Sequence, residues 1–159
     1  MRKALCTIAA ASALFALAAS PARADDNYYD DDNLFSIEAC ESPDSSSFNF
    51  HIYYNSGLNG AWRNIGYHVY NFDVLRPGGS SHDTYPLRFC SEGASSPWPG
   101  SGQHIKNNAA SGENTHYKYK AHVYYNSGYK GVQDVMDPYQ HHDRFINVYN
   151  ENASFQWTS

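Results

Sequence analysis

Apolar and polar side chains alternate along two stretches of the chain, residues 48–54 and 119–125. Alternation with a period of two puts one set of side chains on each face of an extended backbone, so both stretches are predicted to be half-buried β-strands. No window of comparable length shows a convincing helical period. The apolar positions are Phe48, Phe50, Ile52 and Tyr54 in the first stretch, and Tyr119, Ala121, Val123 and Tyr125 in the second.

The two stretches belong to an internal repeat. Residues 51–60 return 71 positions later as residues 122–131, with seven of the ten positions identical. A shorter match joins residues 107–111 to residues 150–154 at an offset of 43, so the first copy carries an insert between its matching ends. The chain is therefore predicted to hold motif one at about 48–112, with an insert at about 73–103, and motif two at about 117–159.

Each copy is predicted to form a hairpin. The runs at 55–57 and 126–128 read Asn-Ser-Gly, which tolerates the positive φ of a tight turn, and Gly60 and Gly131 recur where a backbone bends. Further strands are expected at 67–72, 144–149 and 155–157. The insert holds four prolines and five glycines, which predicts an irregular loop in which residues 85–90 form a short edge strand.

Neither copy is long enough to enclose a core alone, so the two copies are predicted to pack face to face as paired sheets. When the segment 1–24 is left out, aromatic side chains outnumber those of Ile, Leu and Val together. This balance favours β-structure around a largely aromatic core. The expected fold class is all-β, in one domain at 48–159.

The segment 1–24 has the pattern of a secretory signal peptide: basic Arg2 and Lys3, an apolar run at 4–19, and the small-x-small site Ala22-Arg23-Ala24. The segment 25–47 is rich in aspartate and is predicted to be a flexible leader that carries the first remaining cysteine. The protein is expected to be secreted and extracellular, with no membrane association after cleavage.

Loss of the signal peptide changes the net charge from −5 to −8, because three basic residues are removed. So acidic a surface repels nucleic acid, and no nucleic-acid partner is expected. Two cysteines, Cys40 and Cys90, then remain in an oxidising compartment and are predicted to form one disulfide. The mature chain is expected to be a monomer.

Four segments carry a combined pattern: Tyr-Tyr-Asn-Ser-Gly at 53–57 and 124–128, Ile-Lys-Asn-Asn-Ala-Ala-Ser at 105–111, and Val-Tyr-Asn-Glu-Asn-Ala-Ser-Phe-Gln-Trp at 148–157. Together they resemble the secreted actinobacterial peptidase-inhibitor family, whose founding member inhibits metalloproteinases. The resemblance covers roughly residues 48–157. It implies a βγ-crystallin-like fold, in which two Greek-key motifs form a two-sheet sandwich, and an extracellular peptidase, in particular a metallopeptidase, as partner.

The resemblance also implies where calcium would bind. Related βγ-crystallins bind it with a segment Asn/Asp-Asn/Asp-x-x-Ser/Thr-Ser, whose oxygens suit a hard cation. Here Glu151 replaces the usual Asn or Asp, and Gly112 and Phe155 replace the final serines. Calcium binding is therefore expected to be weak or absent, with no cofactor required; the alternative is that these side chains cap turns. The residues concerned are Asn107, Asn108 and Ser111 in the first copy, and Asn150, Glu151 and Ser154 in the second.

Inhibition requires a stiff loop that enters a peptidase cleft, and a disulfide-tethered, proline-rich insert has that stiffness. Leu87, Arg88 and Phe89 are bulky residues beside Cys90 and are the predicted inhibitory residues. The alternative is that they pack over the edge of a sheet.

The chain lacks the usual catalytic motifs, including His-Glu-x-x-His, Gly-x-Ser-x-Gly and a phosphate-binding glycine loop. His141 and His142 are adjacent, so on an extended segment they point to opposite faces and cannot easily chelate one ion. His51 and His122 occupy equivalent positions on the polar faces of their strands. No enzymatic activity is expected. The function expected is peptidase inhibition, with a structural or calcium-binding crystallin-like protein, or a small secreted toxin, as the alternatives.

Overall fold

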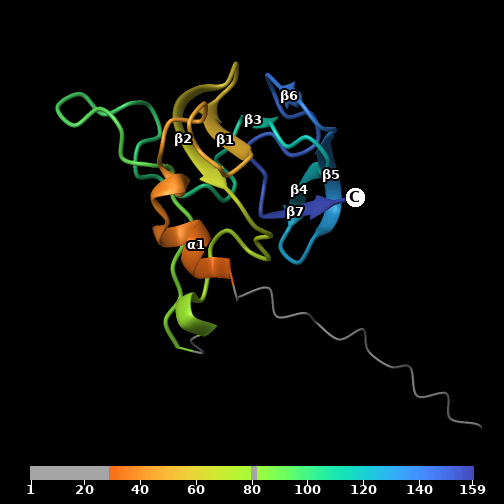
Figure 1. Cartoon of the computed structure of the whole chain (residues 1–159), viewed down its shortest axis with the longest axis horizontal. Helices are drawn as coiled ribbons and strands as arrows, with labels where there is room; N and C mark the ends of the chain where they lie inside the picture. The colour runs from red at the N-terminus through yellow and green to blue at the C-terminus, as the bar shows by residue number, and fades with distance from the viewer. Residues whose placement is uncertain (1–28, 80–81) are drawn as a thin grey trace, which may run out of the picture.

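A computed structural model describes residues 29–79 and 82–159, so the predicted signal peptide lies outside the described residues. Two antiparallel sheets face each other, one of four strands in the order β2-β1-β3-β6 and one of three in the order β5-β4-β7 (Figure 1). The strands are β1 (Phe50–Asn55), β2 (Asn59–Ile65), β3 (Ser111–Asn114), β4 (Lys120–Asn126), β5 (Lys130–Met136), β6 (Gln140–His142) and β7 (Ser154–Thr158). The helical elements are α1 (Asp30–Phe35), η2 (Ile37–Ala39) and η3 (Pro77–Gly79).

Both predicted hairpins are confirmed, β1 with β2 and β4 with β5. Their turns have the same geometry, because Gly57 and Gly128 both have φ 76°. The residues that follow these glycines, Leu58 and Tyr129, are also left-handed. The repeat in the sequence is therefore a repeat in backbone conformation.

A serine from the shorter repeat closes each hairpin turn. The Ser111 hydroxyl donates to Asn55 O at 2.6 Å. The Ser154 hydroxyl makes the equivalent bond to Asn126 O at 2.7 Å. The two parts of the repeat thus contact each other within each motif.

The two copies exchange strands, which is the property that makes them Greek keys. β6 comes from motif two but pairs with β3 in the sheet of motif one. At the equivalent place in motif one, Val69 forms a single antiparallel bridge to Phe155 of β7 in the other sheet. The predicted all-β sandwich of two Greek-key motifs is therefore confirmed, with the strand expected at 67–72 reduced to one bridge.

The strand predicted at 144–149 is wrong. This segment instead folds around Asp134, a carboxylate on β5 that is only 2% exposed. The Asp134 carboxylate accepts hydrogen bonds from the backbone N–H groups of Ile146, Asn147 and Val148 at 2.9–3.2 Å. Because these N–H groups are used by a side chain, they cannot pair with a neighbouring strand.

The prediction of a largely aromatic core is wrong: five phenylalanines lie among twelve aliphatic and methionine side chains, and the described tyrosines and tryptophans stay outside this cluster or only partly buried against it. Phe50 of β1 and Phe155 of β7 stack in parallel with ring centroids 4.3 Å apart, which joins the two sheets directly. Three more phenylalanines are fully buried beside them: Phe72, Phe89 and Phe145.

The prediction of a flexible acidic leader is wrong for its described part. Residues 30–39 form α1 and η2; η2 packs against β2, and α1 packs against η2 and η3 (Figure 1). Asp30 is 4% exposed and accepts a hydrogen bond from Arg76 N at 2.6 Å. Asn64 of β2 donates to the carbonyls of Glu38 and Glu41, each at 2.8 Å. Aspartates at the start of a helix favour its formation, so the acidic run is compatible with order.

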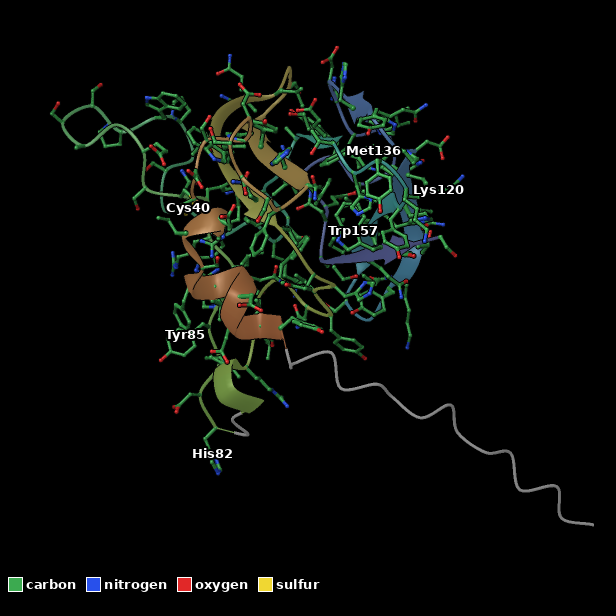
Figure 2. The ribbon with its side chains drawn as sticks, in the orientation of Figure 1. Cys40, His82, Tyr85, Lys120, Met136 and Trp157 are labelled. Atoms are coloured by element: carbon green, nitrogen blue, oxygen red, sulfur yellow. A yellow bond between two sulfur atoms is a disulfide. The ribbon has the colours of Figure 1, made fainter. Side chains whose placement is uncertain are left out.

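The predicted disulfide between Cys40 and Cys90 is confirmed, with 5.6 Å between the two Cα atoms. It joins the end of η2 to the insert across a sequence separation of 50 residues. The N-terminal segment is therefore tied covalently to the domain that it packs against (Cys40 is labelled in Figure 2).

Candidate functional site

The part of the insert that follows Cys90 forms the 91–99 loop, defined as residues 91 to 99. It extends from the body of the molecule beyond β2 and is seen at the upper left of Figure 1. Ser91 and all six residues at 94–99 are exposed, and Trp98 keeps 47% of its surface. Among the described residues, no other element covers this run. The loop therefore presents its backbone and side chains to a partner.

Hydrogen bonds close the base of the 91–99 loop. The Ser101 hydroxyl accepts from Glu92 N at 2.9 Å, and Trp98 N donates to Glu92 O at 3.0 Å, so the two arms are joined. The arms are also held to β2, because Cys90 N donates to Trp62 O and Ala61 N donates to Pro99 O, each at 2.8 Å. Together with the disulfide, these bonds fix both ends of the loop.

The interior of the loop is restricted as well. Ser96 N donates to Gly93 O at 2.9 Å, and Gly93 has φ 76°, where a Cβ would clash with Ser96 O. Pro97 and Pro99 each fix one φ angle. The Trp98 indole packs edge-on against Trp62, with ring centroids 5.4 Å apart. The exposed loop therefore keeps few alternative conformations.

The predicted inhibitory residues are wrong for two of the three positions. Leu87 is 0% exposed and Phe89 is 1% exposed, and both belong to the core between the sheets. Arg88 is exposed, but its guanidinium donates to Gly102 O at 2.9 Å across the insert. Alternation explains the result, because a short bridged segment that buries Leu87 and Phe89 must turn Arg88 outward. The sequence feature that could have identified the exposed segment is the run after Cys90, which shows no alternation of apolar and polar residues and ends in Pro-Trp-Pro.

The two segments predicted to bind calcium lie side by side, as the repeat symmetry requires. Asn152 joins them: its amide donates to Ala109 O at 2.7 Å, and Asn107 N donates to the Asn152 carbonyl at 2.8 Å. Asn150 N donates to Ala109 O at 3.0 Å in return. A shallow cavity of about 350 Å³ lies beside this junction, and Asn107, Asn150 and Glu151 contribute to its walls.

The donor groups at this junction do not fit a hard cation well. Ser111 and Ser154 are fully buried, and each hydroxyl already donates to a carbonyl and accepts from a backbone N–H. The Asn108 amide donates to Gln103 Oε1 at 3.0 Å. Within the described ranges no three His, Cys, Asp or Glu side chains form a possible metal site. The two serine hydroxyls bond to carbonyls at the hairpin turns, and weak or absent calcium binding stays a prediction.

Calcium at 5 mM is expected to raise the melting temperature by less than about 2 °C. The serine oxygens already make hydrogen bonds within the protein, so the Kd for calcium should be high, and a ligand stabilises a protein only when its free concentration exceeds its Kd. Differential scanning calorimetry with magnesium as the matched ion measures this shift. Saturable heat in isothermal titration, with a Kd below about 1 mM, would contradict the expectation.

The described histidines do not form a catalytic pair. His51 is completely buried, which corrects the expectation that it lies at the sheet surface. Its Nδ1 lies 2.8 Å from Asn64 Oδ1. Because the Asn64 amide nitrogen already donates to two carbonyls, its oxygen must accept, and His51 is the neutral Nδ1–H tautomer. Its equivalent, His122, contacts Gln133 and Thr158 instead.

The buried His51 makes stability depend on pH. Desolvation lowers the pKa of His51 below its ordinary value of 6.5, although its bond to Asn64 opposes this shift. The unfolded chain therefore binds a proton near pH 6.5 that the folded protein does not bind until a lower pH. The free energy of unfolding is thus expected to fall as pH drops below 6.5, by about 1.4 kcal/mol for each pH unit that separates the two pKa values.

Urea denaturation between pH 5 and 8 measures this dependence. His51→Gln cannot titrate, so the variant is expected to lose stability less steeply than the wild type between pH 6.5 and 5. His122→Gln, at the equivalent but partly exposed position, is the matched control and should keep the wild-type slope. Parallel curves for the wild type and His51→Gln would show that another group causes the pH dependence.

No family model matches the chain, and no curated protein matches it. Two solved structures resemble it in fold. One, described as "Evolution of the eye lens beta-gamma-crystallin domain fold", matches with a TM-score of 0.47 and 10% identity over 70% of this chain and 86% of that chain. The other is the N-terminal domain of Protein S, with a TM-score of 0.44 and 17% identity over 70% of this chain and 96% of that chain.

The class of protein is defined by the strand exchange and the two paired sheets: the chain is an all-β protein with the βγ-crystallin-like fold. In the part of the chain that the structure describes, no helix is long and apolar enough to cross a membrane.

Proposed function

We propose that this protein is a secreted inhibitor of an extracellular peptidase, acting through the 91–99 loop and without catalysis of its own. The observation that carries the proposal is the loop itself: an exposed segment that projects from a β-scaffold and is held at both ends. The resemblance of residues 48–157 to a family of peptidase inhibitors supports the same function, and it favours metallopeptidases as targets.

Rigidity gives the loop its effect. A flexible substrate loses conformational entropy when it enters a peptidase cleft, and this loss weakens its binding. Here the disulfide at Cys90, the bonds between Glu92 and Ser101, and the two prolines remove much of that freedom before binding. If the peptidase cut the loop, these same contacts would keep both new ends in place, which favours resealing over release.

The chemistry of the loop suits a water-excluding cleft. The exposed run Ala-Ser-Ser-Pro-Trp-Pro at 94–99 holds no charged side chain, so its burial leaves no unpaired charge. Trp98 supplies a large aromatic surface, and aromatic residues of this kind dominate the binding energy of protein interfaces. The charged residue nearest to the run, Glu92, lies at the base of the loop and is partly buried.

The test is a panel of thermolysin-like, serine and cysteine peptidases incubated with the mature protein, with residual activity measured on a small chromogenic substrate. Inhibition of a metallopeptidase at near-stoichiometric concentration is the expected result. No inhibition anywhere in the panel would overturn the proposal and favour a non-inhibitory crystallin-like structural role.

A further inference from the structure

Besides the cavity beside Asn107 and Asn150, the structure has a second cavity, and the 91–99 loop contributes no residue to its walls. We name it the aromatic groove. It has a volume of about 580 Å³, which is in the usual range for small-ligand sites. Its lining comes from four separate parts of the chain: Ser47, Phe48, Asn49, Gly66, Tyr67, His68, His116, Tyr119, Trp157, Thr158 and Ser159.

The walls of the aromatic groove are held in place by specific contacts. Trp157 of β7 (labelled in Figure 2) donates from its indole nitrogen to Gly66 O at 3.0 Å, and its backbone N–H donates to His68 Nδ1 at 3.0 Å. The His116 ring lies against the indole with centroids 5.3 Å apart. Tyr67 is stacked on Tyr29 at 4.1 Å. The groove is therefore formed before any ligand arrives.

The two histidines supply hydrogen-bond donors to the groove. His116 Nδ1 accepts from Lys118 N and Tyr119 N, at 2.9 and 3.1 Å, so the proton of the neutral ring is on Nε2. His68 Nδ1 accepts from Trp157 N, which selects the same tautomer. Desolvation is the main cause that lowers the pKa of His116, and the positive charge of Lys118 lowers it further. This ring therefore stays neutral at pH 7.

The composition of the lining selects among ligand classes. Four aromatic rings from Phe, Tyr and Trp are combined with hydroxyls, an amide and two imidazoles. None of the lining side chains among the described residues carries a fixed charge, although the chain as a whole has a net charge of −5. The ammonium group of Lys118 lies over the Tyr119 ring, 5.1 Å from its centroid, but Lys118 is not part of the lining, so no lining side chain is a counter-ion for a phosphate or an ammonium group. It suits a neutral ligand with apolar faces and many hydroxyls.

An extended peptide fits this groove less well. Peptides commonly bind by adding a strand to a free sheet edge, where backbone N–H and C=O groups are open. Here Val69 and Phe155 already bond to each other in both directions, at 2.8 and 2.9 Å, and Trp157 N is used by His68. The edge of β7 beside the groove therefore offers few backbone donors, whereas the side chains offer ring faces and polar groups.

We infer that the aromatic groove is a binding site for a neutral saccharide. The C–H faces of sugar rings would pack on the aromatic side chains, and their hydroxyls would bond to the imidazoles, the Asn49 amide and the Thr158 hydroxyl. The site lies apart from the 91–99 loop, so the inference does not depend on the proposed function. A protein with both features would hold its inhibitory loop near a polysaccharide surface.

The three tryptophans of the chain make the test specific, because each gives one indole N–H signal in a ¹⁵N NMR spectrum. Single Trp→Phe variants assign the three signals. The full mature protein is titrated with cellotetraose, maltotetraose, laminaritetraose and the tetramer of N-acetylglucosamine. At least one should shift the Trp157 signal saturably, while the Trp62 and Trp98 signals stay in place. If no signal moves by about 10 mM ligand, or Trp98 alone moves, the inference is overturned.

Two variants separate groove binding from surface adhesion. Tyr119→Ala removes an aromatic wall that is 36% exposed and should weaken saccharide binding about fivefold or more. Tyr85→Ala removes a tyrosine of similar exposure, 46%, outside the groove and should bind as the wild type does. Equal affinities for the two variants would overturn the inference. So would tighter, salt-dependent binding of oligogalacturonate, or an equal Trp157 shift with an uncharged tetrapeptide.

Discussion

Replacing Trp98 with alanine is expected to weaken peptidase inhibition at least about 30-fold, the effect of losing about 2 kcal/mol at an interface hot spot. Trp98 is the largest exposed side chain of the 91–99 loop and is flanked by two prolines that hold its backbone. Its ring also leans on Trp62, so the alanine variant loses both the contact with the peptidase and part of the loop's rigidity. The measurement is the inhibition constant against the most strongly inhibited peptidase of the panel.

Trp98→Phe is the informative companion variant, because it keeps an aromatic ring and should retain most of the inhibition. Tyr139→Ala is the control for general loss of surface aromatics: Tyr139 is 72% exposed and lies in the turn between β5 and β6. It should inhibit like the wild type. If Trp98→Ala inhibits as strongly as the wild type, with an unchanged melting temperature, the 91–99 loop is not the binding element.

Replacing both Cys40 and Cys90 with alanine is expected to lower the free energy of unfolding by about 4 kcal/mol. The disulfide closes a long stretch of chain, and in the chain-entropy model a crosslink of this length restricts the unfolded ensemble by that amount. In the folded protein the same bond holds η2 beside β2 and fixes the start of the 91–99 loop. Equilibrium denaturation in urea measures the change.

The variant should also inhibit less strongly, because one end of the loop is released. Wild-type protein reduced with a thiol is the matched control and should show the same loss of stability. If the double variant is within about 1 kcal/mol of the wild type, the noncovalent contacts alone, such as those from Asn64 to the carbonyls of 38 and 41, must hold the N-terminal segment.

The hairpins were predictable because their signals are local. Alternation over a few residues decides which side chains share a face, and a glycine at a positive-φ position decides where the chain turns. The repeat strengthened both signals, since Gly57 and Gly128 perform the same task in equivalent turns. The disulfide followed from the cysteine count once the predicted signal peptide, which holds the third cysteine, is left out. These features depend on residues that are neighbours in the chain or on a pairing with no alternative.

Several of the errors concern what covers a surface. The N-terminal segment, predicted to be a flexible leader, supplies carbonyls that accept hydrogen bonds from Arg63 and Asn64 of β2, and both side chains are buried. Burial lowers the pKa of Arg63 to about 10. Leu87 and Phe89 were expected outside and lie in the core. In each case the deciding contact joins segments that are distant along the chain, which a local pattern does not record.

The amino-acid sequence by itself determined the duplicated hairpins and the single disulfide. Only the tertiary structure decided that residues 30–39 pack beside β2, that Leu87 and Phe89 of the insert lie in the core while residues 94–99 are exposed, and that distant segments meet at Trp157 to form the aromatic groove. The physical reason is that side-chain periodicity assigns residues to a face, whereas the partner of that face depends on how the whole chain packs.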